Sequence, residues 1–355
     1  MRIRFIAAMP KSHYSGGRLL ALTLAESLAM NGADVDFVTD NVPFMYEEFR
    51  PFSRIRLITT TFDNLSPHVV RDLDFVIIVP HQGQIEVHSE FLRHAIECNA
   101  QIGLLNFESP NWFNSVSPFK RDPAIWAGWD LISGYADLIL SISREGQTYA
   151  REYYRGCKSA CRFRYCYPAI NSVLADKAKD SSVRQNRIMC LTRLDPHKGF
   201  VDLEPLATRE LAGFSIDVFM GNGEIPSDVV RKLRASFAKL DIEFATHGPI
   251  VGIEKFEWLK SSAALYFPTR FEGFGIPPLE AAYCGTPVAC SDLPVLREFG
   301  ETAFFYAMPS NHGAMQLAAL NAVRSGSIDA DNRQRFTKLG DMANCGSRLS
   351  QALAE

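Results

Sequence analysis

The sequence predicts an α/β protein with two doubly wound parallel-sheet domains of the Rossmann type, and three observations support this prediction. Short apolar runs alternate with amphipathic helical stretches along the chain, which is typical of strand–helix–strand units. Several of the apolar runs are nearly continuous, as in parallel strands that helices cover on both faces. The length of 355 residues suits two domains, and a hydrophobic content of 47% can fill two cores.

The first half of the chain begins with a strand over 2–9 and a loop that ends at Gly16 and Gly17. The next stretch, 18–32, places leucines on one face of a helix and ends at Gly32. A second helix fits 85–98. The other expected strands of this half are apolar runs at 33–39, 53–58, 73–80, 100–106 and 136–143.

A second series follows residue 170, with expected strands at 187–192, 214–221, 242–248, 263–268, 286–291 and 303–307. The helices expected among them lie at 227–239, 252–261 and 278–284, and 332–355 also looks helical. We therefore expect a first domain over 1–170, a second over 171–335, and a C-terminal helix over 336–355 that packs back on the first domain. Ligands of such sheets bind at the carboxyl ends of the strands, so the two domains are expected to face a cleft.

Composition and charge exclude several classes of protein. A net charge of −3 argues against a general nucleic-acid binder. No apolar run approaches the ~20 residues that span a bilayer, and the N-terminus lacks a signal-peptide cleavage site, so we expect a cytoplasmic protein. The eight cysteines form no C-x-x-C pair. We expect reduced thiols, at Cys157, Cys161 and Cys166 too, and no metal site.

Nucleotide-binding motifs of other families are incomplete. The G-N-G at 221–223 and the G-F-G at 273–275 both lack the third glycine of the dinucleotide fingerprint. The D-L-D at 72–74 stands at the start of a strand, the wrong end of a parallel sheet for a ligand. There is no Walker A sequence. A nicotinamide-dependent oxidoreductase is therefore disfavoured.

The most informative segment is YFPTRFEGFGIPPLEAAYCGTPVACSD, at 266–292. A strand ends at Phe267, and the prolines at 277 and 278 can open a helix that Gly285 ends. Gly273 and Gly275 let the backbone approach a ligand closely. Free N–H groups in this loop and at the helix start suit an anion such as a diphosphate.

Two glutamates flank the start of this helix. Glu272 precedes it and Glu280 lies in its first turn, so both can face one ligand. The alternative is a structural role, in which an acidic residue at the start of a helix favours its macrodipole.

The segment closely resembles the signature of family 4 glycosyltransferases, retaining enzymes of the GT-B type, which reads E-G-F-G-x-x-x-x-E-A-x-x-x-G-x-P-V. The matching residues are Glu272, Gly273, Phe274, Gly275, Glu280, Ala281, Gly285, Pro287 and Val288. LTRLDPHKG at 191–199 resembles the family's G-R-L-x-x-x-K-G segment, with Thr192 in place of glycine. Other segments that resemble parts of the family's sequence are VFMGNGE, ADLILSISREGQ and YPAIN. The resemblance covers about 140–300 well and the N-terminal part loosely, through Gly16 and Gly17.

The resemblance implies a hexosyltransferase that works without metal or other cofactor. Arg193 and Lys198 would clamp the donor diphosphate, since both cations suit phosphate oxygens. Glu272 would contact the transferred sugar and Glu280 the donor ribose. The other residues assigned to donor binding are Gly273, Phe274, Gly275, Gly16, Gly17, Gly221 and His81.

The first domain is implied to bind the acceptor. The family's cleft histidine follows the strand that corresponds to 100–107, where this sequence has Glu108 instead. We therefore expect Glu108 to contact the sugar or to act as the catalytic base in place of that histidine. His81 and His13 are alternative candidates.

GFGIPPLEA looks like the form common among mannosyltransferases. GDP-mannose is therefore the first expected donor and a UDP-sugar the second, with a saccharide or lipid-linked saccharide as acceptor in polysaccharide biosynthesis. Two alternatives stay open. One is a GT-B-fold nucleotide-sugar epimerase, against which the paired glutamates argue. The other is a catalytically silent binding subunit, which Thr192 and Glu108 would suit.

Two further stretches each have more than one explanation. Three of the four tryptophans lie in 111–129, where their rings could stack on sugars, seat the protein at a membrane, or pack in the core. Six basic residues lie in 144–164: Arg144, Arg151, Arg155, Lys158, Arg162 and Arg164. They suit a peripheral contact with the anionic inner face of a membrane, or simply a solvated helix face.

Overall fold

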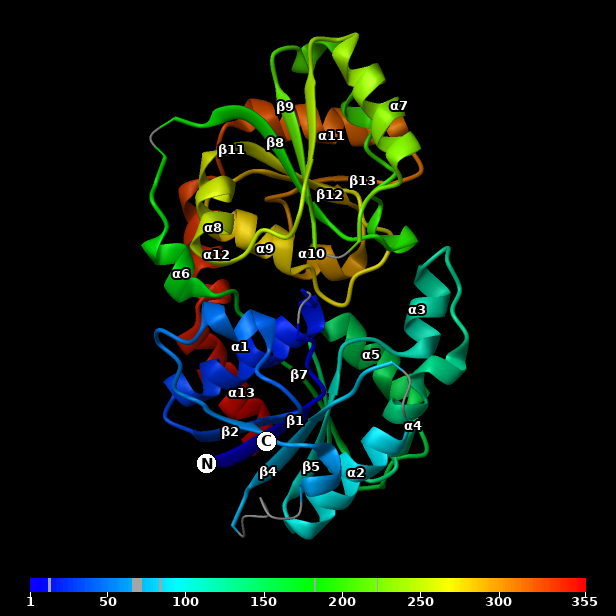
Figure 1. Cartoon of the computed structure of the whole chain (residues 1–355), viewed down its shortest axis with the longest axis vertical. Coiled ribbons are helices and arrows are strands. Elements are labelled where there is room, and N and C mark those ends of the chain that lie inside the picture. Colours follow the sequence, from blue (N-terminus) through cyan, green and yellow to red (C-terminus); the bar gives the residue numbers. More distant parts are fainter. Residues whose placement is uncertain (12–13, 66–71, 83–84, 182, 222) are drawn as a thin grey trace. The chain divides into compact units, whose positions relative to one another are not determined.

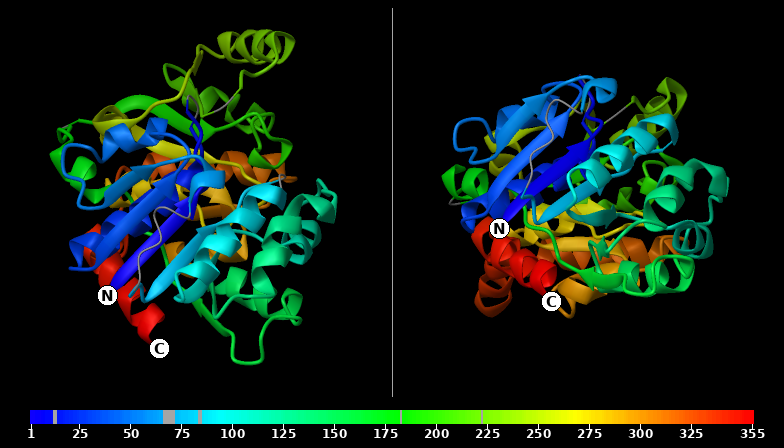
Figure 2. Two further views of the ribbon diagram at one scale, coloured as in Figure 1. Left: turned by 60° about the horizontal axis from the view of Figure 1, so that its bottom comes forward. Right: turned by 90° about the horizontal axis from the view of Figure 1, so that it is seen from below.

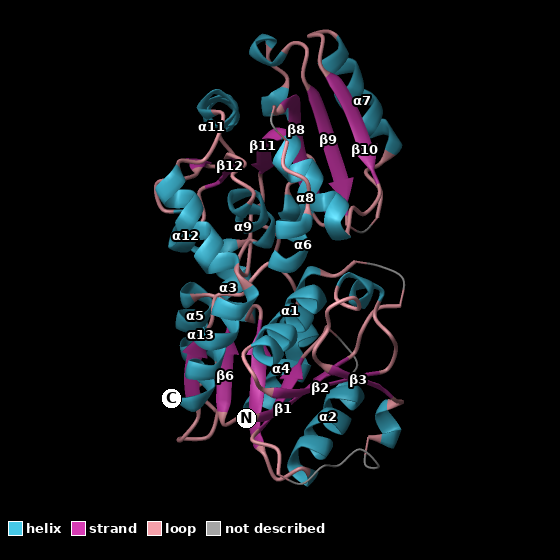
Figure 3. Cartoon of the chain, turned by 90° about the vertical axis from the view of Figure 1, so that its left-hand side faces the viewer, coloured by secondary structure: helices cyan, strands magenta, loops and turns pink. Residues whose placement is uncertain are grey.

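The computed structural model describes the chain except residues 12–13, 66–71, 83–84, 182 and 222 (Figure 1). It contains two compact units, each described here by itself. The first comprises 1–116, 120–169 and 341–355, and the second comprises 117–119 and 170–340. Both are parallel sheets covered by helices, as Figure 3 shows, so the predicted α/β class and the two Rossmann-like sheets are confirmed.

The first unit is built on a seven-stranded sheet with the order β3-β2-β1-β4-β5-β6-β7. Its strands are β1 (Arg2–Ala7), β2 (Asp34–Thr39), β3 (Arg56–Thr59), β4 (Phe75–Val79), β5 (Gln101–Asn106), β6 (Leu138–Ser141) and β7 (Arg162–Tyr165). All pairings among them are parallel. Every residue of β4 is buried, as its continuous apolar sequence predicts.

A row of charges crosses three strands of this sheet, with Arg4 and Asp36 buried and Arg56 largely exposed. Arg4 on β1 lies directly opposite Asp36 on β2, with Nη2 2.7 Å from Oδ2. Asp36 also binds Arg56 on β3, at 2.6 Å. A buried charge is tolerated only with a partner, so the row specifies how these three strands align.

The helices of the first unit are α1 (Gly16–Met30), α2 (Ile85–Glu97), α3 (Pro110–Val116), α4 (Ala127–Ser133), α5 (Arg144–Tyr153) and α13 (Met342–Ala354). α13 packs on α1, and Figure 2 shows it in red beside the blue elements of this unit. The two helices meet closely, because a Cβ added at Gly346 would lie 2.0 Å from the carbonyl oxygen of Ser27.

The second unit has a six-stranded sheet with the order β10-β9-β8-β11-β12-β13. Its strands are β8 (Gln185–Thr192), β9 (Ser215–Met220), β10 (Glu243–His247), β11 (Ser262–Phe267), β12 (Val288–Ser291) and β13 (Phe305–Ala307). Its helices are α6 (Ser172–Lys177), α7 (Ser227–Ala238), α8 (Gly252–Ser261), α9 (Ile276–Tyr283), α10 (Pro294–Gly300), α11 (His312–Ser325) and α12 (Ala330–Gly340).

The C-terminal stretch is two helices rather than one. Asp341 separates α12 from α13, and its carboxylate accepts a hydrogen bond from the Asn344 backbone amide as an N-cap. α12 packs on α9 in the second unit, so the chain returns to the first unit at Asp341 and not at residue 336. Among the described residues, no helix is both long enough and apolar enough to cross a bilayer.

Candidate functional site

The glycine-rich loop between β11 and α9 has a backbone that only glycine adopts readily. Gly275, immediately before α9, has φ 106°, and a Cβ there would lie 2.4 Å from Cδ2 of Leu296. Phe274 stacks on Phe299 with ring centroids 4.7 Å apart, so its side chain belongs to the core. At residues 273–275, it is therefore the backbone rather than a side chain that suits a ligand, beside the N–H groups at the start of α9.

Lys198 and Glu272 form an ion pair at the carboxyl ends of two adjacent strands. Lys198 follows β8 and Glu272 follows β11, and Lys198 Nζ lies 2.7 Å from Glu272 Oε1. Burial lowers the pKa of the Lys198 ammonium, and the Glu272 carboxylate opposes that shift. The structure thus joins two residues that the sequence assigned to the site separately.

Hydrogen bonds join the two loops that carry this ion pair. The Arg270 amide and the Thr269 hydroxyl both donate to the carbonyl oxygen of His197, at 2.7 and 3.1 Å. The guanidinium of Arg270 makes a bidentate contact with Asp202, at 2.9 and 2.7 Å. Sequence reasoning missed this second ion pair. These bonds hold Lys198 and Glu272 in place, which is the preorganisation that an electrostatic site needs.

Arg193 lies on the same segment as Lys198, and Asp195 contacts both Arg193 and His197. Arg193 Nη2 lies 3.5 Å from Asp195 Oδ2, and its side chain is 42% exposed. Asp195 also pairs with Nδ1 of the buried His197. Burial lowers the pKa of His197 to about 4, although the Asp195 carboxylate acts to raise it. The imidazole is therefore neutral at pH 7.

This pKa shift predicts acid sensitivity. Below the ordinary His pKa of 6.5, the unfolded chain binds a proton at His197 that the folded chain refuses until about pH 4. Stability should therefore fall as the pH drops through this window, by about 2 kcal/mol at pH 5 relative to pH 7.5. In urea unfolding at both pH values, His197→Asn should lose this much of the pH dependence, whereas the exposed His312→Asn should keep it. A smaller acid loss in wild type than in His197→Asn would contradict the neutral assignment.

Glu280 has a buried partner that the sequence analysis did not identify. Lys255 Nζ, on α8, lies 2.6 Å from Glu280 Oε1 on α9, and both side chains are 3% exposed. A signal was present, because Lys255 shares the buried face of α8 with Phe256 and Leu259. A lysine on an apolar helix face requires a carboxylate partner. The pair fixes the position of the Glu280 carboxylate through Oε1.

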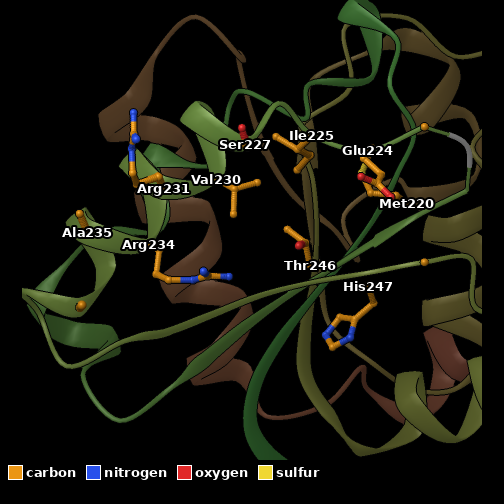
Figure 4. Close-up of a pocket in the computed structure, with 13 residues that line it drawn as sticks. Met220, Glu224, Ile225, Ser227, Val230, Arg231, Arg234, Ala235, Thr246 and His247 are labelled. Carbon is orange, nitrogen blue, oxygen red and sulfur yellow. The ribbon is translucent and has the colours of Figure 1, made fainter.

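Gly221 lies directly after β9, and its amide donates to the carbonyl of Thr192 at 2.8 Å. A hollow of about 740 Å³ lies beside this turn, at the carboxyl ends of β9 and β10. Figure 4 shows its lining, with Arg231 and Arg234 on α7 and Thr246 and His247 on β10. None of the residues in the ion pairs above lines it.

The candidates of the first unit lie just beyond the carboxyl ends of β1, β4 and β5. Gly16 and Gly17 are the first residues of α1. The amide of His81 donates to Nε2 of His88 at 3.1 Å, and the two rings stack at 4.5 Å. Glu108 lies 3.5 Å from Arg121.

Gln82, after β4, donates to Glu108 at 3.5 Å, which brings the ends of β4 and β5 together. His13 lies outside the described residues. Among those described, no group of three or more histidines, cysteines, aspartates or glutamates is placed to share a metal ion.

Burial decides the open alternatives for the tryptophans, and contacts within the chain involve part of the basic stretch. The rings of Trp112, Trp126 and Trp129 are buried, so the tryptophan-rich stretch packs in the core of the first unit. Much of the basic stretch is engaged within the chain. Lys158 binds Asp137 at 2.8 Å, and Arg162 and Arg164 donate to carbonyl oxygens at the end of α13 and beyond it.

The comparisons with known proteins agree with this geometry. Residues 185–326 match the family model described as Glycosyl transferases group 1. The chain is 43% identical over 58 residues to the O-antigen chain mannosyltransferase RfbU of Salmonella typhimurium, and 35% identical over 75 residues to the O-antigen chain mannosyltransferase B of Escherichia coli. The matched stretches are 16% and 21% of this chain, and 16% and 20% of those relatives.

The fold comparison covers the whole chain. The crystal structure of Anabaena Alr3699/HepE in complex with UDP and glucose aligns with a TM-score of 0.74 at 13% identity, over 100% of this chain and 99% of that one. The predicted GT-B fold is therefore confirmed.

Proposed function

Since residues 185–326 match the model of the group 1 glycosyltransferases, we propose that the whole chain is a retaining glycosyltransferase that takes a hexose from a nucleoside-diphosphate sugar. The observation that carries the proposal is the Lys198–Glu272 ion pair, held beside a glycine-rich loop and the start of α9. A cation, a carboxylate and free backbone N–H groups converge there, which suits a diphosphate and the sugar attached to it. The second unit is accordingly the donor-binding domain.

The diphosphate is bound by charge. Lys198 moves from Glu272 to a phosphate oxygen, and the exposed guanidinium of Arg193 takes a second position on the diphosphate. The N–H groups at the start of α9 add fixed dipoles that favour the charge of the leaving group. Glu272, released from Lys198, accepts hydrogen bonds from the hydroxyls of the transferred sugar. Glu280, held in place by Lys255, accepts hydrogen bonds from the ribose hydroxyls.

Transfer occurs on one face of the sugar. The bond between the anomeric carbon and the phosphate oxygen breaks through an oxocarbenium-like state, and the acceptor hydroxyl attacks from the side the phosphate leaves. The leaving phosphate oxygen takes the hydroxyl proton, so the anomeric configuration of the donor is kept in the product.

The first unit is proposed to bind the acceptor, a saccharide or a lipid-linked saccharide. Glu108 and His81 stand at the carboxyl ends of its strands, where they can meet sugar hydroxyls. Gly16 and Gly17 present the N–H groups of α1. GDP-mannose is the first donor candidate, since both matched relatives are O-antigen mannosyltransferases. UDP-sugars come second, since the fold neighbour was crystallised with UDP and glucose.

A thermal-shift panel of GDP, UDP, ADP and CMP, without added divalent metal, tests the donor class. A ligand that binds only the folded protein raises the melting temperature by mass action. One nucleoside diphosphate is expected to give a selective shift that Arg193→Ala weakens, while the exposed Arg209→Ala leaves it unchanged. No shift with any nucleotide, or a shift only with a divalent ion present, would contradict the proposed donor site.

Turnover is tested with the sugar donor of the nucleotide that binds. Isotope-labelled hexose is offered with lipid-linked saccharides as acceptors, and NMR of the product reports the anomeric configuration. An α-linked product from an α-linked donor is expected. An inverted product would remove the retaining mechanism, and conversion of the donor without an acceptor would favour the epimerase.

A further inference from the structure

Two cysteines flank the long segment 170–340, which makes up nearly all of the second unit. The chain leaves the first unit after Ala169 and returns at Asp341. Cys166 precedes this segment and Cys345, on α13, follows it. Both belong to the first unit, and no role in the proposed transfer uses either of them.

The two thiols meet at one backbone oxygen. Cys166 Sγ and Cys345 Sγ each donate to the carbonyl of Tyr167, at 3.6 Å in both cases. Arg348, one turn after Cys345 on α13, donates to the same oxygen from Nη2 at 3.2 Å. A dithiol therefore lies beside a guanidinium, although 179 positions separate the two cysteines in the sequence.

This surrounding favours a thiolate in the pair. Hydrogen bonding from Cys166, together with Arg348, lowers the pKa of Cys345 to about 7. The neighbouring Cys345 and burial raise the pKa of Cys166 well above its ordinary value. The two sulfurs thus hold one proton between them near neutral pH, and thiolates beside cations are the reactive cysteines of proteins.

A pocket leads to one of the two sulfurs. A hollow of about 330 Å³ lies between β7 and α13, and Cys166 is part of its lining. Arg164, Arg348 and Glu355 also line it, and the Gln351 side-chain amide donates to the Glu355 carboxylate at 2.6 Å. The two guanidinium groups suit a ligand that carries carboxylates. Cys345 is fully buried and does not line the pocket.

We propose that Cys166 and Cys345 form a reactive dithiol that a low-molecular-mass, carboxylate-bearing disulfide oxidises through this pocket to an internal disulfide. The bond would tie the chain before segment 170–340 to the chain after it. This inference is independent of the proposed transferase activity.

The small disulfide is the oxidant in this thiol–disulfide exchange. The Cys166 thiolate, with the shared proton on Cys345, attacks one sulfur of the small disulfide and releases one small thiolate. The Cys345 thiolate then attacks the Cys166 sulfur in the mixed disulfide and releases the second. The first small thiolate released takes the proton from Cys345 before the second attack. The pair therefore loses two electrons and its one shared proton, and the small disulfide leaves as one thiol and one thiolate.

Other cysteines provide the comparison. Cys157 and Cys161 are half-buried neighbours in the loop before β7, and burial together with the proximity of Cys157 raises the pKa of Cys161 to about 12. This second pair is closer in sequence and better exposed, but Cys161 stays a thiol at neutral pH. The proposal therefore predicts that the buried pair reacts first.

The test is peptide mapping of the full-length reduced protein after incubation with glutathione disulfide at pH 7.5. Free thiols are alkylated, the protein is digested without reduction, and cross-linked peptides are identified by mass spectrometry. A Cys166–Cys345 cross-link is expected to appear before any Cys157–Cys161 link and to disappear with dithiothreitol. The same reaction in urea shows that the reagent reaches every cysteine. A native protein that stays free of the Cys166–Cys345 link would overturn the proposal.

Variants check the order of the two steps. Cys345→Ser should retain glutathione on Cys166, whereas Cys166→Ser should leave the enclosed Cys345 unmodified. Arg348→Gln should slow cross-linking about tenfold, for one unit of thiol pKa, while Arg151→Gln, outside the pocket, should not. Equal modification of Cys345 in Cys166→Ser, or an unchanged rate in Arg348→Gln, would refute the route through the pocket.

Discussion

Replacement of Lys198 by methionine is expected to lower kcat/KM for the sugar donor by about 10³-fold, the upper part of the range for losing one transition-state donor. Methionine keeps most of the volume of the side chain but lacks the ammonium group. The leaving diphosphate then loses a cation, and Glu272 loses the partner that lies 2.7 Å away. The measurement is steady-state kinetics with the donor identified by the binding panel.

A matched control uses a lysine outside the site. Lys232 on α7 is largely exposed, 3.9 Å from Asp228, and Lys232→Met should leave kcat/KM within about twofold, as for most surface substitutions. Lys198→Arg separates charge from geometry. It keeps the cation but changes its shape, so it should recover part of the loss and not all of it. Wild-type turnover by a folded Lys198→Met protein would refute the proposed role of the clamp.

Replacement of Gly199 by alanine is expected to destabilise the second unit by about 3 kcal/mol or more, because strain and overpacking act together. Gly199 has φ 68°, and a Cβ there would lie 2.0 Å from the carbonyl oxygen of Pro268. The added methyl group would push the loop of Lys198 away from the loop of Glu272. Urea unfolding measures the loss of stability, and the thermal-shift panel should show weaker nucleotide binding.

Gly213→Ala is the matched control for backbone strain. Its φ is 79°, similar to that of Gly199, but nothing lies within 4 Å of its Cβ position. This variant should therefore cost only the strain of a left-handed residue, about 1–2 kcal/mol. Equal losses in the two variants would mean that the close approach of the two loops contributes nothing.

Local sequence patterns predicted most of the elements. Each strand expected from an apolar run is present, with ends within a few residues of the expected ones, because runs such as 75–79 are buried on both faces in a parallel sheet. α11 was missed, since its alanine-rich sequence shows weak periodicity. The expected single helix over 336–355 was interrupted by the Asp341 cap.

The glycine loop at 273–275 and the charged residues near it were visible in the sequence, because a turn with positive φ and a proline-opened helix are local features. Their pairing was not. Lys255 and Glu280 are 25 positions apart, and their ion pair exists only because α8 packs on α9. The tryptophans of 111–129 were equally ambiguous. The sequence around a tryptophan does not show whether its ring stacks on a sugar or packs in a core.

By itself, the sequence determined the alternation of strands and helices, the position of the glycine loop and the residue types of the proposed donor site. These follow from periodicity and backbone conformation within a few residues of each position. The tertiary structure decided which carboxylate meets which cation, which rings are buried, and that Cys166 and Cys345 share one carbonyl oxygen. Those contacts join distant segments, and sheet order and helix packing set them rather than local spacing.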